Sequence, residues 1–160
     1  MKMNKKMMSM LLALVMLFLL PGTAVQAASK GYGFTYDGVT VYMHGNAQTL
    51  IDKMGTPQKK TKAKSCAYDG EDIKYVYKDF TLVTYTQKDG GTEYVQTITF
   101  TTKNAKTRRG IGIGSSEKNM KKQYGKARPK YGVYTYKKGK MATLFTVEDA
   151  KVTAVEYVAY

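Results

Sequence analysis

Residues 39–55 read VTVYMHGNAQTLIDKMG, and residues 111–125 read IGIGSSEKNMKKQYG. In both stretches, two large side chains lie four positions apart, and the second directly precedes a glycine. A spacing of four places two side chains on the same side of a helix, where they can pack against a larger structure. The repeated pattern therefore predicts two short, equivalent helices. The two pairs are Leu50 with Met54, and Met120 with Tyr124.

The residues that flank these pairs fit the ends of helices. Asn46 and Ser116 (or Ser115) carry side-chain oxygens that can accept hydrogen bonds from the free N–H groups at a helix start. Gly55 and Gly125 follow the last turn, where a positive φ favours glycine. Helices of about eight residues are unstable alone, so we expect both to depend on packing against a larger element.

Each predicted helix is followed by a basic loop and then by three stretches rich in Val, Thr, Tyr and Phe, a composition typical of β-strands. The turns between them are short, which favours antiparallel hairpins. We also expect an extra strand in the first half at residues 65–68, SCAY. The six main stretches are residues 73–77, 80–86 and 93–100 in the first half, and 132–136, 141–147 and 151–159 in the second.

These elements predict an α+β fold of two tandem α-βββ units, with antiparallel meander sheets and short helices packed on one sheet face. The second unit repeats the order of the first after a polar, basic linker. The predicted divisions are a signal peptide at 1–27, an N-terminal segment at 28–38, the first unit at 39–102, the linker at 103–110 and the second unit at 111–160.

The doubled order of a short capped helix and Tyr-rich meanders, such as YVYKDFTLVTY at 75–85 and KVTAVEYVAY at 151–160, resembles the fold of the β-lactamase-inhibitor proteins. It is similar also to the SmpA/OmlA outer-membrane assembly lipoproteins, which carry one related unit. The resemblance spans residues 39–160. It implies an exported, non-enzymatic protein that binds other proteins through a sheet surface, and no inhibitor contact residue carries over.

Residues 1–27 have the features of a secretory signal. Three lysines precede an apolar run at residues 7–20, and the small residues Val25 and Ala27 occupy the −3 and −1 positions of a cleavage point. The apolar run is short for a membrane span. We expect cleavage after Ala27, a secreted or extracytoplasmic protein, and no transmembrane span once the signal is removed.

The segment GIGIGSSEK, residues 110–118, has glycines that suggest a phosphate-binding loop. It lacks the Gly-Lys-Ser/Thr ending of a Walker loop, and Ser115 stands where a dinucleotide fingerprint has its third glycine. The repeat gives a different interpretation, in which this segment leads into the second helix. Gly112 and Gly114 then serve a bend or close packing, and we predict no nucleotide site.

The sequence shows no recognisable catalytic, cofactor or metal site. Cys66 is the one cysteine and His44 the one histidine, and nothing in the sequence pairs them. We interpret Cys66 as a small buried strand residue, so we expect the folded protein to react slowly with thiol reagents. Zinc normally needs three or four ligands, and His44 is a lone histidine at a turn, so we also expect no bound zinc. Asp69, Glu71 and Asp72 are assigned to a turn. An enzyme with an unrecognised site is the alternative.

The formal net charge of +14 attracts anionic partners at a rate that falls with salt. Lysines gather after the first predicted helix and along and after the second. The other interpretation is a solvated surface with no ligand. For an exported protein, an anionic envelope polymer is a better partner than nucleic acid. The candidate anion-binding residues are Lys59, Lys60, Lys62, Lys121, Lys122 and Arg128.

The predicted sheet also has a face that points away from the helices. If Ile98 and Tyr157 face the helices, alternate positions point the other way, and we expect Val95 and Val152 among them. A face that mixes apolar, Thr and aromatic residues can mark a binding surface. Alternatively, a second sheet or residues 32–38 cover it. The candidate partner-binding residues are Tyr85, Thr97, Thr99, Phe145 and Glu156.

We accordingly predict an exported, non-enzymatic protein-binding module that acts through this sheet face, with another protein as its partner. The alternative is a basic protein that binds the cell wall or a membrane surface through its lysines. The two functions differ in salt dependence, because salt screens contacts between exposed charges far more than apolar contacts.

Overall fold

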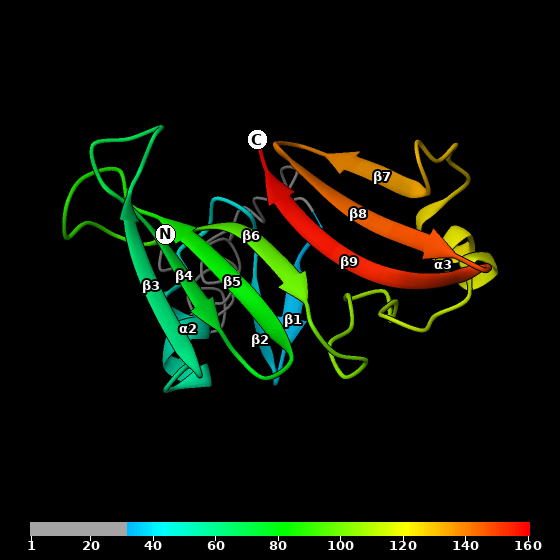
Figure 1. Ribbon diagram of the computed structural model, residues 1–160, viewed down its shortest axis with the longest axis horizontal. Helices are drawn as coiled ribbons and strands as arrows, with labels where there is room; N and C mark the ends of the chain where they lie inside the picture. The colour runs from blue at the N-terminus through cyan, green and yellow to red at the C-terminus, as the bar shows by residue number, and fades with distance from the viewer. Residues whose placement is uncertain (1–31) are drawn as a thin grey trace, which may run out of the picture.

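The computed structural model describes residues 32–160, so the predicted signal peptide and its cleavage after Ala27 lie outside the described residues. A seven-stranded antiparallel sheet forms the centre of the fold (Figure 1). Its strands follow the spatial order β3-β4-β5-β6-β9-β8-β7. They are β3 (Lys59–Lys64), β4 (Glu71–Val76), β5 (Phe80–Tyr85), β6 (Tyr94–Phe100), β9 (Lys151–Ala159), β8 (Met141–Glu148) and β7 (Val133–Lys138).

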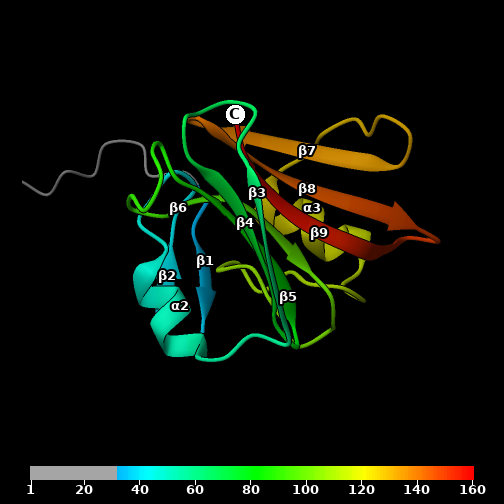
Figure 2. The ribbon, with the colours of Figure 1, turned by 60° about the vertical axis from the view of Figure 1, so that its left-hand side comes forward.

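Two short helices and a small hairpin lie on the same side of this sheet (Figures 1 and 2). The helices are α2 (Gln48–Met54) and α3 (Glu117–Tyr124), and the hairpin consists of β1 (Phe34–Tyr36) and β2 (Val39–Val41). The hairpin pairs antiparallel, with Phe34 opposite Val41. The predicted α+β class, dominated by antiparallel sheet with short helices, is confirmed.

Both helices end as the sequence predicts, and one begins as predicted. The Ser116 side chain accepts a hydrogen bond from the Asn119 N–H at 3.2 Å. In α2 the N-cap position is Ala47, one residue later than expected, although the Asn46 side chain still accepts from the Gln48 N–H at 2.8 Å. Gly55 and Gly125 close the helices with φ of 62° and 99°, a region that favours glycine.

The two predicted helix pairs pack into the core. Leu50 and Met120 are fully buried, Tyr124 is nearly so, and Met54 packs against the core while partly exposed. Burying a side chain of this size stabilises a fold by about 1.5–3 kcal/mol. Since α2 and α3 are so short, this burial accounts for their presence better than their intrinsic propensity does.

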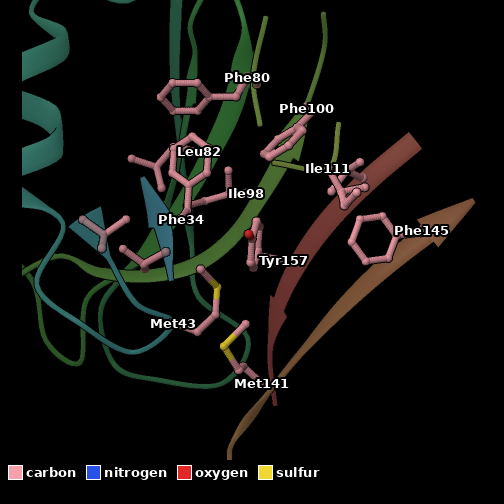
Figure 3. Close-up of a cluster of buried hydrophobic side chains, with 14 of the residues drawn as sticks. Phe34, Met43, Phe80, Leu82, Ile98, Phe100, Ile111, Met141, Phe145 and Tyr157 are labelled. Carbon is pink, nitrogen blue, oxygen red and sulfur yellow. The ribbon is translucent and has the colours of Figure 1, made fainter. Parts of the chain in front are cut away.

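An aromatic cluster joins the hairpin to the sheet (Figure 3). The ring of Phe34 lies 5.0 Å from that of Phe80, 5.5 Å from Phe100 and 6.1 Å from Tyr157. Phe34, Phe80 and Tyr157 are fully buried. The hairpin therefore covers the helix side of the sheet. The alternative in which residues 32–38 cover the opposite side is wrong.

The six main strand predictions are confirmed within two residues at each end, and two local predictions are wrong. The first predicted basic loop contains β3, an edge strand with four lysines and every residue exposed. Lysine on an edge strand discourages pairing with another chain, which explains its unusual composition. The segment SCAY is a bend between β3 and β4, not a strand.

The two meanders join edge to edge through β6 and β9 into a single sheet, so no second large sheet formed by residues 32–160 lies over either face. In this antiparallel join, Ile98 is opposite Tyr157 and Thr99 is opposite Glu156. One face of the seven-stranded sheet consequently carries the helices and the hairpin, and the other carries no described helix or strand (Figure 1).

Candidate functional site: the open face of the sheet

The sheet face opposite α2, α3 and the hairpin is called the open face. Directly paired residues of an antiparallel ladder share a face, so the pairing register identifies its members. One continuous row crosses from β5 to β7, and a second crosses from β5 to β8. The open face comprises Val76, Thr81, Val83, Thr97, Thr99, Val133, Thr135, Ala142, Leu144, Thr146, Ala154, Glu156 and Val158.

The open face is rich in Thr and Val, with one acidic residue near its centre and basic residues at its margins. Thr135 is exposed and the small Ala142 is buried, while the other members are half-buried, as side chains are when only their lateral neighbours shield them. Glu156 is its one acidic residue, and it accepts a hydrogen bond from the Thr99 hydroxyl at 3.4 Å. Lys74 and Lys137 continue the second row outward and are exposed. Apart from Glu156, the arrangement resembles an interface with an uncharged centre and a charged rim.

Three of the five predicted partner-binding residues lie on the open face, and one does not. Thr97, Thr99 and Glu156 are there. Phe145 is fully buried on the opposite side, with its ring 4.8 Å from that of Tyr124. It pairs directly with Val155, a core residue, so the expected alternation in β8 was one residue out of register.

Two bulges explain a second error in the expected face. The ladder shifts opposite Val83 and Thr84, which makes Gln96 an extra residue in β6. An equivalent shift opposite Thr146 and Val147 makes Thr153 an extra residue in β9. An extra residue reverses the alternation along the strand. Val95 and Val152 are therefore buried in the core, not on the open face as predicted.

Tyr85 lies on the open side by register but is not an exposed contact. It is 5% exposed because Tyr68 stacks on it, with ring centroids 4.7 Å apart. Its hydroxyl hydrogen-bonds with Nδ1 of His44 at 3.0 Å, and burial raises the pKa of Tyr85. Tyr68, Tyr85 and Tyr94 line a hollow of about 380 Å³ at this end of the sheet. A partner would meet Tyr68 and Tyr94 before it met Tyr85.

The six predicted anion-binding residues lie in two separate places. Lys59, Lys60 and Lys62 are on the edge strand β3, whereas Lys121 and Lys122 are on α3, which packs against β9. Arg128 follows α3 in an irregular segment.

Two of these six residues have acidic partners, and a third has an aromatic partner. Lys62 pairs with Glu71 at 2.8 Å and Lys121 with Glu117 at 2.5 Å, and each hydrogen bond raises the pKa of its lysine. Lys60 lies 4.6 Å above the ring of Tyr75. These residues do not form a single site, and anion binding by either group stays a prediction.

Cys66 is exposed in the bend between β3 and β4, so its expected burial is wrong. His44 adopts a φ of 60°, and its Nε2 is buried without a hydrogen-bond partner among residues 32–160. Within the same described residues, no group of three or more His, Cys, Asp or Glu side chains is placed to hold a metal ion. The absence of a metal from the protein stays a prediction.

The glycine-rich segment before α3 serves close packing and a bend, as predicted. A Cβ on Gly112 would lie 2.5 Å from the carbonyl oxygen of Ala105, closer than any side chain can approach a backbone atom. Gly114 has a φ of 87°, which favours glycine. Ile111, the residue before Gly112, is fully buried in the core.

Comparison with family models, with curated proteins and with solved structures gives no match to this chain. No helix in the described part of the chain is long and apolar enough to cross a membrane. The open face, its residues and its surroundings are therefore the main basis for a functional proposal.

Proposed function

We propose that this chain is an exported, non-enzymatic module that binds another protein through the open face. The observation that carries the proposal is the uncovered pair of Thr- and Val-rich rows across the sheet. Antiparallel sheets with one solvated face usually show polar residues there. Val83, Leu144 and Val158 depart from that rule near the middle of the face, where a partner would gain most by burying them.

The charge distribution supports a partner with acidic groups around an apolar patch. Lys74 and Lys137 flank the row that contains Val83 and Val158, and Lys59 continues the row that contains Val76 and Thr81. Exposed lysines at a rim raise the rate of encounter with an acidic protein and add little affinity. The affinity would then come mainly from burial of Val83, Leu144 and Val158. The dissociation rate of the complex would therefore depend only weakly on salt.

The finer architecture of two tandem units, similar to the β-lactamase-inhibitor proteins, is part of the proposal. Gln96 and Thr153 are bulge residues at equivalent positions of the aligned last strands, three residues before Thr99 and Glu156. Thr99 and Glu156 are counterparts in the same alignment, and they pair directly with each other. A two-fold axis through that pair would relate the halves and place the centre of the open face on the axis.

The test is affinity capture from the envelope and medium of the producing cell with three proteins. They are the wild type, Val83→Lys in the open face, and Asn119→Lys, which adds the same charge at an exposed position on α3. We expect the wild type and Asn119→Lys to retain the same stoichiometric protein, and Val83→Lys to bind it at least about tenfold more weakly. No retained protein at low and moderate salt, or equal loss in both variants, would contradict the proposal.

A second candidate function is binding to the cell wall or a membrane surface through lysines. Strand β3 favours this function because its four lysines are all exposed. Of these lysines, only Lys62 and Lys64 form ion pairs with described residues. This function predicts release of the protein from envelopes by salt alone, with equal release of wild type and Val83→Lys. Binding that persists at high salt would exclude it.

A further inference from the structure

A hollow of about 290 Å³ lies on the covered side of the sheet, away from the open face. Its walls come from four parts of the chain: the segment before β1, the residue after β2, the segment between β6 and α3, and the ends of α3 and β7. The lining residues are Tyr32, Gly33, Tyr42, Arg108, Arg109, Tyr124 and Lys138.

Three cations line this hollow, and no acidic side chain of residues 32–160 does. Arg108, Arg109 and Lys138 are all exposed, and none forms an ion pair with a carboxylate among residues 32–160. Lys62 and Lys121 elsewhere on the surface do have such partners. Like charges that converge without a counter-charge repel one another, and a bound anion would remove that repulsion.

Aromatic rings and hydrogen bonds hold the two arginines in place. The Arg109 guanidinium lies 5.1 Å from the ring centroid of Tyr32 and 5.0 Å from that of Tyr124, and it donates to the carbonyl oxygen of Gln123. Arg108 donates from Nη1 to the hydroxyl of Tyr42 at 3.1 Å. A guanidinium packed against aromatic rings is ordered in advance, so less conformational entropy is lost when it binds an anion.

The backbone also fixes the position of the arginine pair. Arg108 and Arg109 occupy a tight turn in which the Gly110 N–H donates to the Thr107 carbonyl at 2.8 Å, and the Thr107 N–H donates to the Ile111 carbonyl at 2.7 Å. Gly33 forms part of the floor, where a Cβ would approach Arg108 and Tyr42 at 3.2 and 3.0 Å. A side chain at this position would therefore press on the Arg108 and Tyr42 side chains.

We infer that this hollow binds a phosphate group, as a phosphomonoester or a pyrophosphate. Arginine forks match phosphate oxygens with paired, charge-assisted hydrogen bonds. A phosphomonoester carries about −1.5 to −2 at neutral pH, so it neutralises more of three positive charges than a carboxylate does. Its several oxygens can accept from Arg108, Arg109 and Lys138 together. This site is separate from the open face, and the inference does not rest on the proposed function.

The experiment is a titration of the purified, isotope-labelled protein with pyrophosphate and with inorganic phosphate, followed through backbone amide NMR signals. Acetate at equal ionic strength is the control ligand. The variants are Arg108→Gln and, as the matched control, Arg128→Gln, which removes the same charge at an exposed position outside the hollow. Thermal unfolding of both variants without ligand verifies that they fold.

We expect pyrophosphate to shift the signals of Gly33, Arg108, Arg109, Gly110 and Lys138, and acetate to leave them in place. Arg108→Gln should weaken pyrophosphate binding about tenfold or more, because it removes charge-assisted hydrogen bonds, and Arg128→Gln less than about twofold. Vesicles with phosphatidate, compared with phosphatidylcholine vesicles, distinguish a lipid phosphomonoester from a soluble one. Shifts spread over the lysines of β3, equal binding of acetate, or equal weakening by both variants would overturn the assignment.

Discussion

The two faces of the central sheet are made by the same strands but by different kinds of residue. The covered face carries large rings such as Phe80, Phe145 and Tyr157, all fully buried beneath the helices and the hairpin. The open face carries mostly Thr and Val, with no described helix or strand in front of it (Figure 2). Neighbouring residues on one strand therefore have opposite roles, one in stability and the other in contact with solvent or a partner.

This difference separates stability from function along each strand. Changes on the covered face should unfold the domain, whereas changes on the open face should leave the fold intact and affect binding. Leu144 and Phe145 are adjacent in β8 and lie on opposite faces, so they form a matched pair for this comparison.

The largest effect is expected from Phe145→Ala. The side chain is fully buried against Tyr124 and Tyr136, so its removal leaves a cavity and should lower the free energy of unfolding by about 3–5 kcal/mol. Leu144→Ala should cost about 1 kcal/mol or less, because Leu144 is only half-buried. Urea unfolding measures both, and equal losses would mean that the two faces are not distinct.

The next effect concerns the contact that holds the hairpin over the covered face. The buried Asp79 carboxylate accepts from the hydroxyls of Tyr36 and Thr102 and from the Asn104 side chain. Asp79→Asn replaces an acceptor-only group with an amide and should cost about 1–3 kcal/mol. Asp37→Asn, at an exposed ion pair with Lys53, is the control and should cost less than about 1 kcal/mol.

The same contact makes the free energy of unfolding fall at both low and high pH. The hydrogen bonds from Thr102 and Tyr36 hold the pKa of Asp79 below its usual range, so this stabilisation is present above pH about 4 and is lost as the pH falls further. The hydrogen bond to Asp79 raises the pKa of Tyr36 to about 12. That contribution is complete below pH about 10 and is lost as the pH rises towards 12. Asp79→Asn should flatten both changes, and an unchanged pH profile would contradict this assignment.

The smallest structural effect is expected at Cys66, which the fold places on neither face. Because its thiol is exposed in the bend after β3, the folded protein should react with a disulfide reagent within about tenfold of the unfolded rate. This reverses the slow reaction predicted from the sequence. Cys66→Ser should abolish labelling without a measurable change in stability. A thiol that reacts only after unfolding would show that the bend is covered.

Local patterns in the sequence were sufficient to predict most of the elements. The helices were recognisable from Leu50, Met120 and their flanking glycines, and the strands from alternation of Val, Thr and Tyr between short turns. These signals act within a few residues, so they do not require knowledge of the fold.

The missed features depend on contacts that the sequence does not display. The single extra residues Gln96 and Thr153 reverse the faces of their strands without disturbing the strand composition. Strand β3 reads as a loop because all its side chains are exposed and most are lysines. The Arg108–Arg109 hollow forms only when distant parts of the chain meet. The sequence does show that two of its three arginines are adjacent, and this was the one available signal for an anion site.

The most direct test of the central claim is to label cysteines on the two faces of β6. In a Cys66→Ser background, Thr97→Cys places a thiol on the open face, and Ile98→Cys places one in the core beside it. If the open face is free to bind a partner, the half-buried Thr97→Cys should react with a maleimide within about tenfold of the unfolded rate. Ile98→Cys should react at least about a hundredfold more slowly than Thr97→Cys, since it must wait for the fold to open. Protection of both positions to the same extent would show that the face is covered and would contradict the account.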